Sequence, residues 1–363
     1  MAGGRLVTST AQRRCRFPID QGPAPPGSRD GAVAGRVVVA TVVQALLELL
    51  LSLTQRTSEL RQLGSAEQQE DHEEDDDQFG RAQVHPAERS GGRREWQPLG
   101  VLECVINISE GRDADVLAAI ADTAGDDLLD LHTDAHHHRS VLTLVGEAAA
   151  RRVATEVVAR IDLRGHDGVH PRIGVVDVVP FVALAGATMA DAIDARDRFC
   201  EWAAAELALP CFRYGPERSL PDIRRQAFAD LVPDCGPPSP HPTAGACAVG
   251  ARELLVAYNL WLADADADVA RRTAAAVRGD GIRALGLQVG DRMQVSMNLI
   301  EPMRVGPAEA WDRVAALAGV QGAELVGLVP QAVLAAAPRS RWEELDLAPD
   351  RTIESRLAAR RDG

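Results

Sequence analysis

The chain has 363 residues, 46% of them apolar, which is enough for one large or two modest globular domains. Its formal net charge of −14 argues against a general role in binding nucleic-acid phosphates. The sequence contains no lysine, which excludes a Schiff base to pyridoxal phosphate, a P-loop lysine and a lysine general base.

Residues 1–98 show neither the repeats nor the alternation of a folded domain. They include an apolar run, Val37–Leu53, and an acidic run, Glu67–Asp77. The apolar run is at the short limit for a membrane span, contains Gln44 and Glu48, and starts too late for a cleavable signal. We expect a low-complexity, disordered extension without membrane contact; one amphipathic helix or a misplaced start codon are the alternatives.

Regular hydrophobic patterning begins after Pro98. Apolar runs and period-two alternation predict strands, whereas apolar residues at helical spacing predict helices. Strands are predicted at residues 99–107, 127–132, 139–146 and 173–184, with helices at 113–125 and 147–161. The order of these elements is βαββαβ.

The same order recurs further along the chain. Helices at 187–208 and 219–231, with a short strand at 210–214 between them, lead into a Pro/Gly-rich loop. Strands at 254–262, 282–290, 293–302 and 323–330 then alternate with helices at 266–279 and 307–319. We therefore predict an α+β fold of two ferredoxin-like βαββαβ subdomains, residues 99–253 and 254–363, with a substrate cleft between them.

The six cysteines show neither a CxxC pair nor the spacing of a disulfide framework. This scatter indicates thiols that serve as small core residues in a reducing compartment. They are Cys15, Cys104, Cys200, Cys211, Cys235 and Cys247. We expect a cytoplasmic protein.

Seven of the nine histidines fall in loop-like positions between Leu131 and Pro242, and loops commonly carry binding groups. Three are consecutive in HTDAHHHRS, which suggests a metal site. Neighbouring side chains in an extended segment alternate in direction, however, so at most two could converge. A polar loop that lines a substrate is favoured over zinc, and an exposed turn is the third interpretation. The seven are His132, His136, His137, His138, His166, His170 and His241.

The segment HDGVHPRIG contains the main catalytic candidate, His170. Gly165 and Gly168 stop the preceding helix and Pro171 holds His170 extended, so a structural turn is one interpretation. A histidine held by a proline and anchored by a buried strand is also well placed for proton transfer near neutral pH. Arg172 could bind a carboxylate in a bidentate manner.

The loop VPDCGPPSPHPTAGACAVGAR has too many prolines for a helix, and Gly236 and Gly245 bracket an ordered segment. Such a rigid loop can hold a flat ring at little entropic cost, although an interdomain linker has the same composition. In ECVINISEGRD, Glu103 and Glu110 are candidate acid or base groups. Their neighbours are typical of a turn and helix cap, so a capping role is favoured.

Eight segments, taken in order, resemble the glutamate formimidoyltransferase (formiminotransferase) family over about residues 99–357. They are ECVINISEG, LLDLHTDAHHHRSVLTLVG, HDGVHPRIGVVDVVPF, LPDIRRQAF, PDCGPPSPHPTAGACAVGAR, LLVAYNLWL, QVSMNLIEP and AELVGLVP. The resemblance implies two α/β subdomains with folate in the cleft between them, the first ending near Arg252.

The implied reaction transfers the formimino group of N-formimino-L-glutamate to N5 of the co-substrate tetrahydrofolate. It gives 5-formiminotetrahydrofolate and L-glutamate, a step in histidine breakdown and one-carbon metabolism. The resemblance makes His170 the catalytic proton carrier and the proline-rich loop the folate contact. From chemistry rather than from the family, Arg139 and Arg172 are candidates for binding substrate carboxylates. The loop comprises Gly236, Pro237, Pro238, Ser239, Pro240, His241, Pro242, Thr243, Ala244 and Gly245.

The resemblance also implies small-molecule substrates, a homodimer, and no metal or nucleic acid. The chain's end near residue 363 predicts transferase chemistry without the cyclodeaminase domain of bifunctional members. Asp167, Val169 and Ala244 depart from the family's motifs, so folate could be held differently. Two other functions stay open: a folate-binding paralogue or a transferase with a different one-carbon donor or acceptor, and a histidine-rich metallohydrolase.

Overall fold

The computed structural model describes residues 100–168 and 170–362. The expected extension at 1–98, with its apolar run at 37–53, lies outside the described residues. Within the part of the chain that is described, no helix combines the length and the apolar character needed to cross a membrane.

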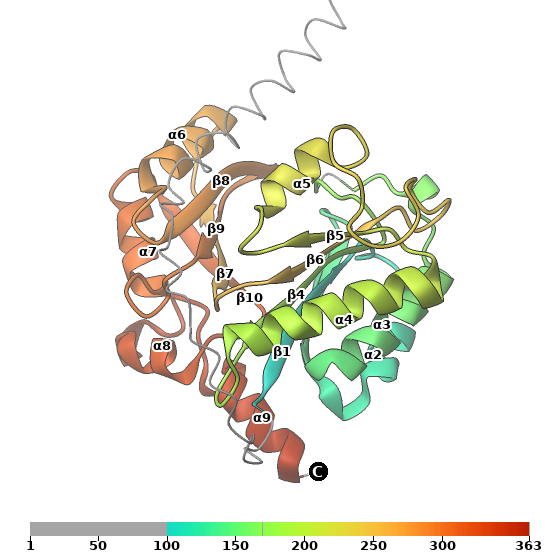
Figure 1. Ribbon diagram of the computed structural model, residues 1–363. Helices are drawn as coiled ribbons and strands as arrows, with labels where there is room; N and C mark the ends of the chain where they lie inside the picture. The colour runs from blue at the N-terminus through green and yellow to red at the C-terminus, as the bar shows by residue number, and fades with distance from the viewer. Residues whose placement is uncertain (1–99, 169, 363) are drawn as a thin grey trace, which may run out of the picture. The chain divides into compact units, whose positions relative to one another are not determined.

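The first unit, from β1 to β6, is built on a six-stranded sheet in the order β2-β3-β1-β4-β6-β5 (Figure 1). Strands β1 to β4 pair with one another in an antiparallel manner and, with α2 and α3, form the predicted ferredoxin-like pattern. Strands β6 and β5 extend the sheet parallel to β4. The bounds are β1 Leu102–Ile108, α2 Ala114–Ala124, β2 Leu128–Asp134, β3 Arg139–Val145, α3 Gly146–Arg160, β4 Val176–Ala183, α4 Met189–Leu207, β5 Cys211–Tyr214, α5 Leu220–Gln226 and β6 Cys247–Ala251.

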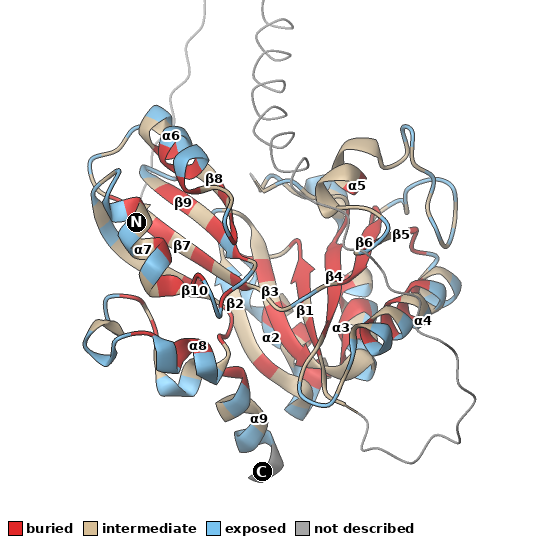
Figure 2. Ribbon diagram, turned by 60° about the vertical axis from the view of Figure 1, so that its left-hand side comes forward, coloured by how far each residue is buried: buried red, intermediate tan, exposed pale blue. Residues whose placement is uncertain are grey.

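Strand β4 is buried on both faces, as its red colour in Figure 2 shows. Val176 and Val179 pack in the core beneath α2, α3 and α4, whereas Val178 packs on the other face with Ile223 of α5. Burial on both sides explains why the strand is a continuous apolar run interrupted only by Asp177. It also places that carboxylate in the protein interior, where it is 2% exposed.

The second unit, from β7 to β10, has a four-stranded antiparallel sheet in the order β10-β7-β9-β8. Val256, Tyr258 and Leu260 of β7 face the core under α6 and α7, and Asn259 and Trp261 alternate with them. The βαββαβ order is therefore confirmed in both units. The bounds are β7 Val256–Leu262, α6 Ala267–Val277, β8 Ile282–Val289, β9 Arg292–Leu299, α7 Pro307–Ala315 and β10 Val320–Val326.

Three features of the fold were not predicted from the sequence. Strand β6, which follows the proline-rich loop, is a run of mostly small residues, CAVGA. Gly250 in this run has no room for a side chain, because a Cβ there would lie 2.1 Å from the ring of Tyr214. Helix α5 ends earlier than expected, and Phe228 just beyond it has a φ of 61°. Two further helices follow β10, α8 (Gln331–Ala336) and α9 (Ile353–Asp362). Ile353 of α9 is buried with Leu129 of β2, so α9 packs on the first unit.

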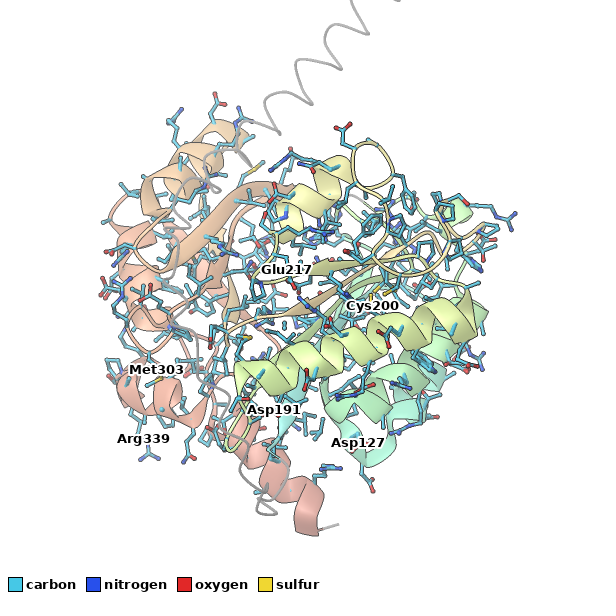
Figure 3. All side chains as sticks on the ribbon, viewed as in Figure 1. Asp127, Asp191, Cys200, Glu217, Met303 and Arg339 are labelled. Carbon is cyan, nitrogen blue, oxygen red and sulfur yellow. The ribbon has the colours of Figure 1, made fainter. Side chains whose placement is uncertain are left out.

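The five cysteines in the described part of the chain are all free thiols. Four are buried, and Cys104, Cys200 and Cys211 belong to the main core of the first unit, as expected for small core residues. Cys200, on α4, is labelled in Figure 3. Cys235 is half-buried, and burial together with its neighbour Cys200 raises its pKa to about 12. Its thiol is therefore protonated at neutral pH.

Glu103 is buried within β1, and this predicts a pH-dependent stability. Burial raises its pKa from 4.5 to about 7, although Arg252 opposes the rise. The folded state therefore binds the proton more tightly, and the free energy of unfolding falls as the pH rises between these two values. Replacement by glutamine should remove that fall and stabilise the protein at pH 8 by about 3 kcal/mol, with little change at pH 4.

Chemical unfolding at the two pH values measures this effect. The exposed Glu343 provides a matched control, because Glu343→Gln should change neither curve. An equal gain for Glu103→Gln at both pH values would show that the carboxyl group does not titrate as stated.

Candidate active site

A small pocket lies where the end of β1, the β2–β3 turn and the loop before β4 meet. All the lining residues belong to the first unit. They are Ser109, His137, His138, Arg139, His166, His170, Arg172 and Asp177.

The loop that carries His170 is held in shape by Arg172. The Nη1 atom of Arg172 donates to the carbonyl oxygens of Gly168 at 2.7 Å and His170 at 2.8 Å, and Nη2 donates to that of His166 at 3.2 Å. A Cβ at Gly168 would lie 2.4 Å from the carbonyl oxygen of His137, so only glycine fits there. Arg172 thus stabilises the loop, and its binding of a substrate carboxylate stays a prediction.

Both ring nitrogens of His170 lie near Nη1 of Arg139, and Nδ1 has the carbonyl oxygen of Pro171 as a closer partner. Its Nδ1 lies 2.7 Å from the carbonyl oxygen of Pro171, which can only accept, so Nδ1 carries the proton. Its Nε2 is contacted by Nη1 of Arg139. Burial, and then the guanidinium groups of Arg139 and Arg224, lower the pKa of His170 to about 2. The ring is therefore neutral at physiological pH, with Nε2 as its basic atom.

Arg139 is a cation without a carboxylate partner among the residues that the structure describes. Its Nη2 donates to Oδ1 of Asn107, and its buried Nε makes no hydrogen bond. Burial lowers the pKa of Arg139 to about 10, so the side chain keeps its charge at neutral pH. A guanidinium group in this position is suited to bind an anion beside the basic atom of His170.

A buried ion pair, Asp177 with Arg224, holds the backbone next to His170 in place. Asp177 of β4 accepts from Nη2 of Arg224 at 2.7 Å, and its other oxygen accepts from the backbone N–H of Ile173 at 2.8 Å. Arg224 of α5 also donates to the carbonyl oxygen of Pro171, the atom that accepts from Nδ1 of His170. The pair therefore fixes the carbonyl group that sets the tautomer of the ring.

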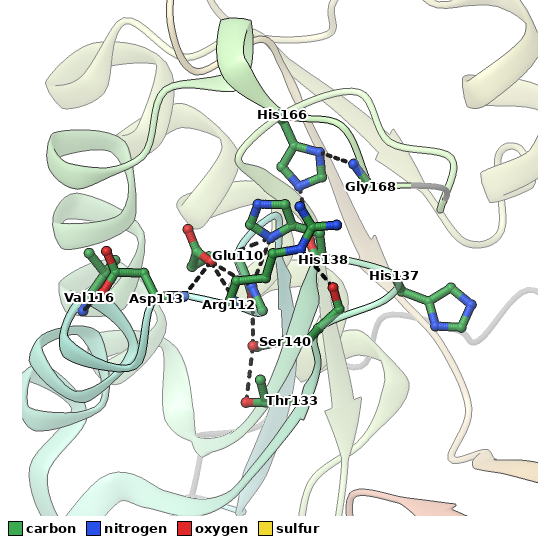
Figure 4. A network of polar contacts seen from close by, with 12 residues as sticks. Glu110, Arg112, Asp113, Val116, Thr133, His137, His138, Ser140, His166 and Gly168 are labelled. Atoms are coloured by element: carbon green, nitrogen blue, oxygen red, sulfur yellow. Dashed lines mark hydrogen bonds and ion pairs between the residues drawn. The ribbon is translucent and has the colours of Figure 1, made fainter. Parts of the chain in front are cut away.

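The three consecutive histidines point in different directions from the β2–β3 turn. Nε2 of His136 accepts from the backbone N–H of Gly290, in the β8–β9 turn of the second unit, at 3.0 Å. His138 stacks on His166 with ring centroids 4.2 Å apart, and Figure 4 shows His137 turned away from them. Only His137 and His138 of the three line the pocket, which agrees with the prediction that at most two neighbouring side chains could converge. Within the described residues, no group of three or more His, Cys, Asp or Glu could hold a metal ion.

Glu110 caps the turn that leads into α2. Its Oε1 accepts from the backbone N–H groups of the next three residues, Gly111–Asp113, at 2.7 to 3.0 Å (Figure 4). Asp113 in turn is the N-cap of α2. Glu110 therefore has the capping role expected for this segment, whereas Glu103 is buried within β1.

The proline-rich loop packs against the base of the His170 loop. The carbonyl oxygen of Thr243 accepts from Leu163 N–H at 2.8 Å, and that of Ala244 accepts from Val175 N–H at 2.9 Å. Ala244 is fully buried, so its methyl group faces the core rather than a ligand. No residue of the loop lines the pocket, and folate contact by Gly236–Gly245 stays a prediction.

Polar side chains also join the two units beside the pocket. Nε2 of His132, on β2, lies 3.2 Å from Oε1 of Glu324 on β10. The other oxygen of Glu324 accepts from Nδ2 of Asn259 at 3.1 Å. The second unit thus reaches the strand that leads into the histidine turn.

The structure brings His170, Arg139 and Arg172 together in one pocket. The sequence did not single out Ser109, whose hydroxyl donates to the carbonyl oxygen of Gly174 at 2.8 Å, or the pair of Asp177 and Arg224. Ser109 is typical of an ordinary turn. The only local sign that Asp177 has a special role is that it is an isolated acid in an apolar strand. The sequence around Arg224 contains no such sign.

Comparison with known proteins gives a consistent result. Residues 101–252 match the model of the formiminotransferase domain, N-terminal subdomain. The chain is 34% identical over 270 residues to the glutamate formimidoyltransferase of Streptococcus pyogenes serotype M1, an alignment that covers 64% of this chain and 90% of that protein. It is 32% identical over 277 residues to the glutamate formimidoyltransferase of Thermoplasma acidophilum, covering 65% and 90% respectively.

A longer relative matches over part of its length. The formimidoyltransferase-cyclodeaminase of Gallus gallus is 35% identical over 276 residues, which are 64% of this chain and 50% of that protein. The chain thus covers nine-tenths of the two shorter relatives and half of the longer one. By these similarities the chain belongs to the formiminotransferase family.

Proposed function

We propose that this protein transfers the formimino group of N-formimino-L-glutamate to N5 of tetrahydrofolate, giving 5-formiminotetrahydrofolate and L-glutamate in histidine degradation. One observation carries the proposal: a neutral imidazole, His170, lies beside Arg139, a cation that forms no ion pair with a carboxylate of the described residues. Both substrates carry glutamate carboxylates, so either could supply the missing anion.

The transfer exchanges one C–N bond for another. N5 bonds to the formimino carbon, the bond from that carbon to the glutamate nitrogen breaks, and one proton passes from N5 to the departing nitrogen. Nε2 of His170 is the basic atom that accepts this proton. A substrate carboxylate bound to Arg139 would draw its guanidinium group away from Nε2 of His170. The negative charge of the carboxylate would also offset the positive charge of Arg139, which opposes protonation of the His170 ring.

Further features belong to the same proposal. Residues 99–253 and 254–363 would be the two subdomains, and the protein would act as a cytoplasmic homodimer without a metal. Contact of the Gly236–Gly245 loop with folate is supported by its packing against the His170 loop, which brings it close to the pocket. The pocket would hold the reacting groups, with the remainder of the folate outside it.

Incubation of the purified protein with tetrahydrofolate and N-formimino-L-glutamate tests the proposal directly. Spectroscopic detection of 5-formiminotetrahydrofolate, with an equal amount of L-glutamate, is the expected result. Equilibrium binding of tetrahydrofolate is measured in parallel. Folate binding without product would instead favour a folate-binding paralogue or another donor, and activity that is lost with a chelator and restored by metal would favour metal-dependent chemistry.

A further inference from the structure

We infer that His137, oriented by Asp134, is a second proton-transfer residue, which protonates the glutamate nitrogen as it departs while His170 takes the proton from N5. This inference rests on the proposed function and deepens it. It is drawn from the geometry of the β2–β3 turn and from the contrast between the surroundings of the two rings.

Asp134 holds the ring of His137 in one orientation. Its Oδ2 lies 2.8 Å from Nδ1 of His137, and its Oδ1 accepts from the backbone N–H groups of His136 and His137, each at 2.8 Å. Burial raises the pKa of Asp134, but the hydrogen bonds from His137 outweigh it and leave that pKa well below its ordinary value. The group is therefore a carboxylate that accepts the Nδ1 proton, which leaves Nε2 as the proton-transfer atom.

His137 and His170 line the same pocket. Their ring centroids are 6.0 Å apart and the rings are steeply inclined, at 77°. A reacting group in the pocket can therefore lie near both rings, the proximity that proton transfer requires.

The surroundings of the two rings differ in the sign of the nearest charge. His170 faces two guanidinium groups, those of Arg139 and Arg224, which favour a neutral ring that can accept a proton. His137 instead faces the carboxylate of Asp134, whose Oδ2 lies 2.8 Å from Nδ1 of the ring. Two titratable groups with opposed surroundings are typical of a base and an acid that divide a reaction between them.

The proton balance of the reaction closes with these two residues. In the proposed cycle, Nε2 of His170 starts without a proton and Nε2 of His137 starts with one. His170 takes the proton that N5 loses as the new C–N bond forms, and Nε2 of His137 gives its proton to the glutamate nitrogen as the old bond breaks. Transfer of one proton from His170 to His137, through a water molecule, then restores the starting state.

The other histidines near the pocket are held by structural contacts. Nε2 of His166 donates to the carbonyl oxygen of His138 at 2.9 Å, and Nδ1 of His166 accepts from Gly168 N–H at 3.1 Å. Nδ1 of His138 accepts from Gly111 N–H at 3.1 Å. His136 binds the second unit instead of the pocket. His137 is therefore the better partner for His170.

The first test compares His137→Gln with Asp134→Asn. For His137→Gln, kcat with N-formimino-L-glutamate should fall about 10- to 100-fold, with KM changed less than about twofold. Asp134→Asn keeps an oxygen that can cap the turn but removes the carboxylate, and should give a smaller loss of kcat in a folded protein. His136→Gln, in the same turn, is the matched control and should retain wild-type kcat.

A second donor separates acid catalysis from a structural effect. The ester O-(4-carboxyphenyl) formimidate keeps a carboxylate and has a phenolate leaving group, which departs without a proton. With this donor the deficit of His137→Gln should shrink to less than about threefold, whereas that of His170→Gln should persist because N5 must still lose its proton. Equal deficits of His137→Gln with both donors, or activity equal to that of His136→Gln, would overturn the inference. Wild-type protein that is inactive with both donors would overturn the proposed function itself.

Discussion

Replacement of His170 by alanine is expected to lower kcat for formimino transfer by about 10²- to 10⁴-fold, the usual range for a general base. The substitution removes Nε2, the basic atom of the pocket, and leaves Arg139 in place to bind substrate. KM for N-formimino-L-glutamate should therefore change much less than kcat. Steady-state kinetics with each substrate varied in turn measures both quantities.

Chemical rescue provides the control for this variant. Added imidazole should restore part of the activity of His170→Ala, because the cavity left by the ring can accept a free base. The thermal unfolding temperature should stay close to that of the wild type, since the ring donates only one hydrogen bond, to Pro171. Near-normal turnover without imidazole would rule out His170 as the proton carrier.

Replacement of Arg139 by glutamine should lower kcat/KM for N-formimino-L-glutamate by about 10²-fold, chiefly through a higher KM, because a charge-assisted hydrogen bond to a carboxylate is lost. The same change removes a cation that lowers the pKa of His170. That pKa should consequently rise from about 2 toward the ordinary value for histidine. Kinetics measures the first effect, and an NMR titration of the ring measures the second.

The exposed Arg164 is a matched control for the loss of one positive charge close to the same loop. It pairs with Asp162 and does not line the pocket, so Arg164→Gln should leave KM and the His170 titration unchanged. An unchanged KM in Arg139→Gln would place the carboxylate site elsewhere. An unchanged titration would show that the guanidinium group does not control the ring.

The fold was accessible from the sequence because its elements carry strong local periodicity. In β7, alternate residues from Val256 to Leu262 are buried, and that alternation is visible in the letters VAYNLWL. Helix α6 likewise begins at Ala267, directly after Asp266, whose side chain caps it by accepting from Val269 N–H. The βαββαβ order could be predicted twice because each element satisfies its own local rule.

The elements and residues that were missed depend on distant partners. Strand β6 is a short run of small residues whose strand character comes from pairing with β4 and β5. The pair of Asp177 and Arg224 joins residues 47 positions apart, and no local pattern indicates such a contact. The histidine triplet could be predicted in part. The alternation of side chains limited how many rings could converge, but only the fold shows that His136 contacts Gly290.

The burial of β4 on both faces has an evolutionary consequence. Asp177, which supports the His170 loop, lies in a strand whose neighbours fill two cores at once, so a substitution there disturbs packing as well as the site. The β2–β3 turn bears no such double constraint, since Ala135 and His136 are exposed. Substitutions that adapt the enzyme to new donors should therefore occur mainly in the β2–β3 turn, whereas the sequence of β4 should change little.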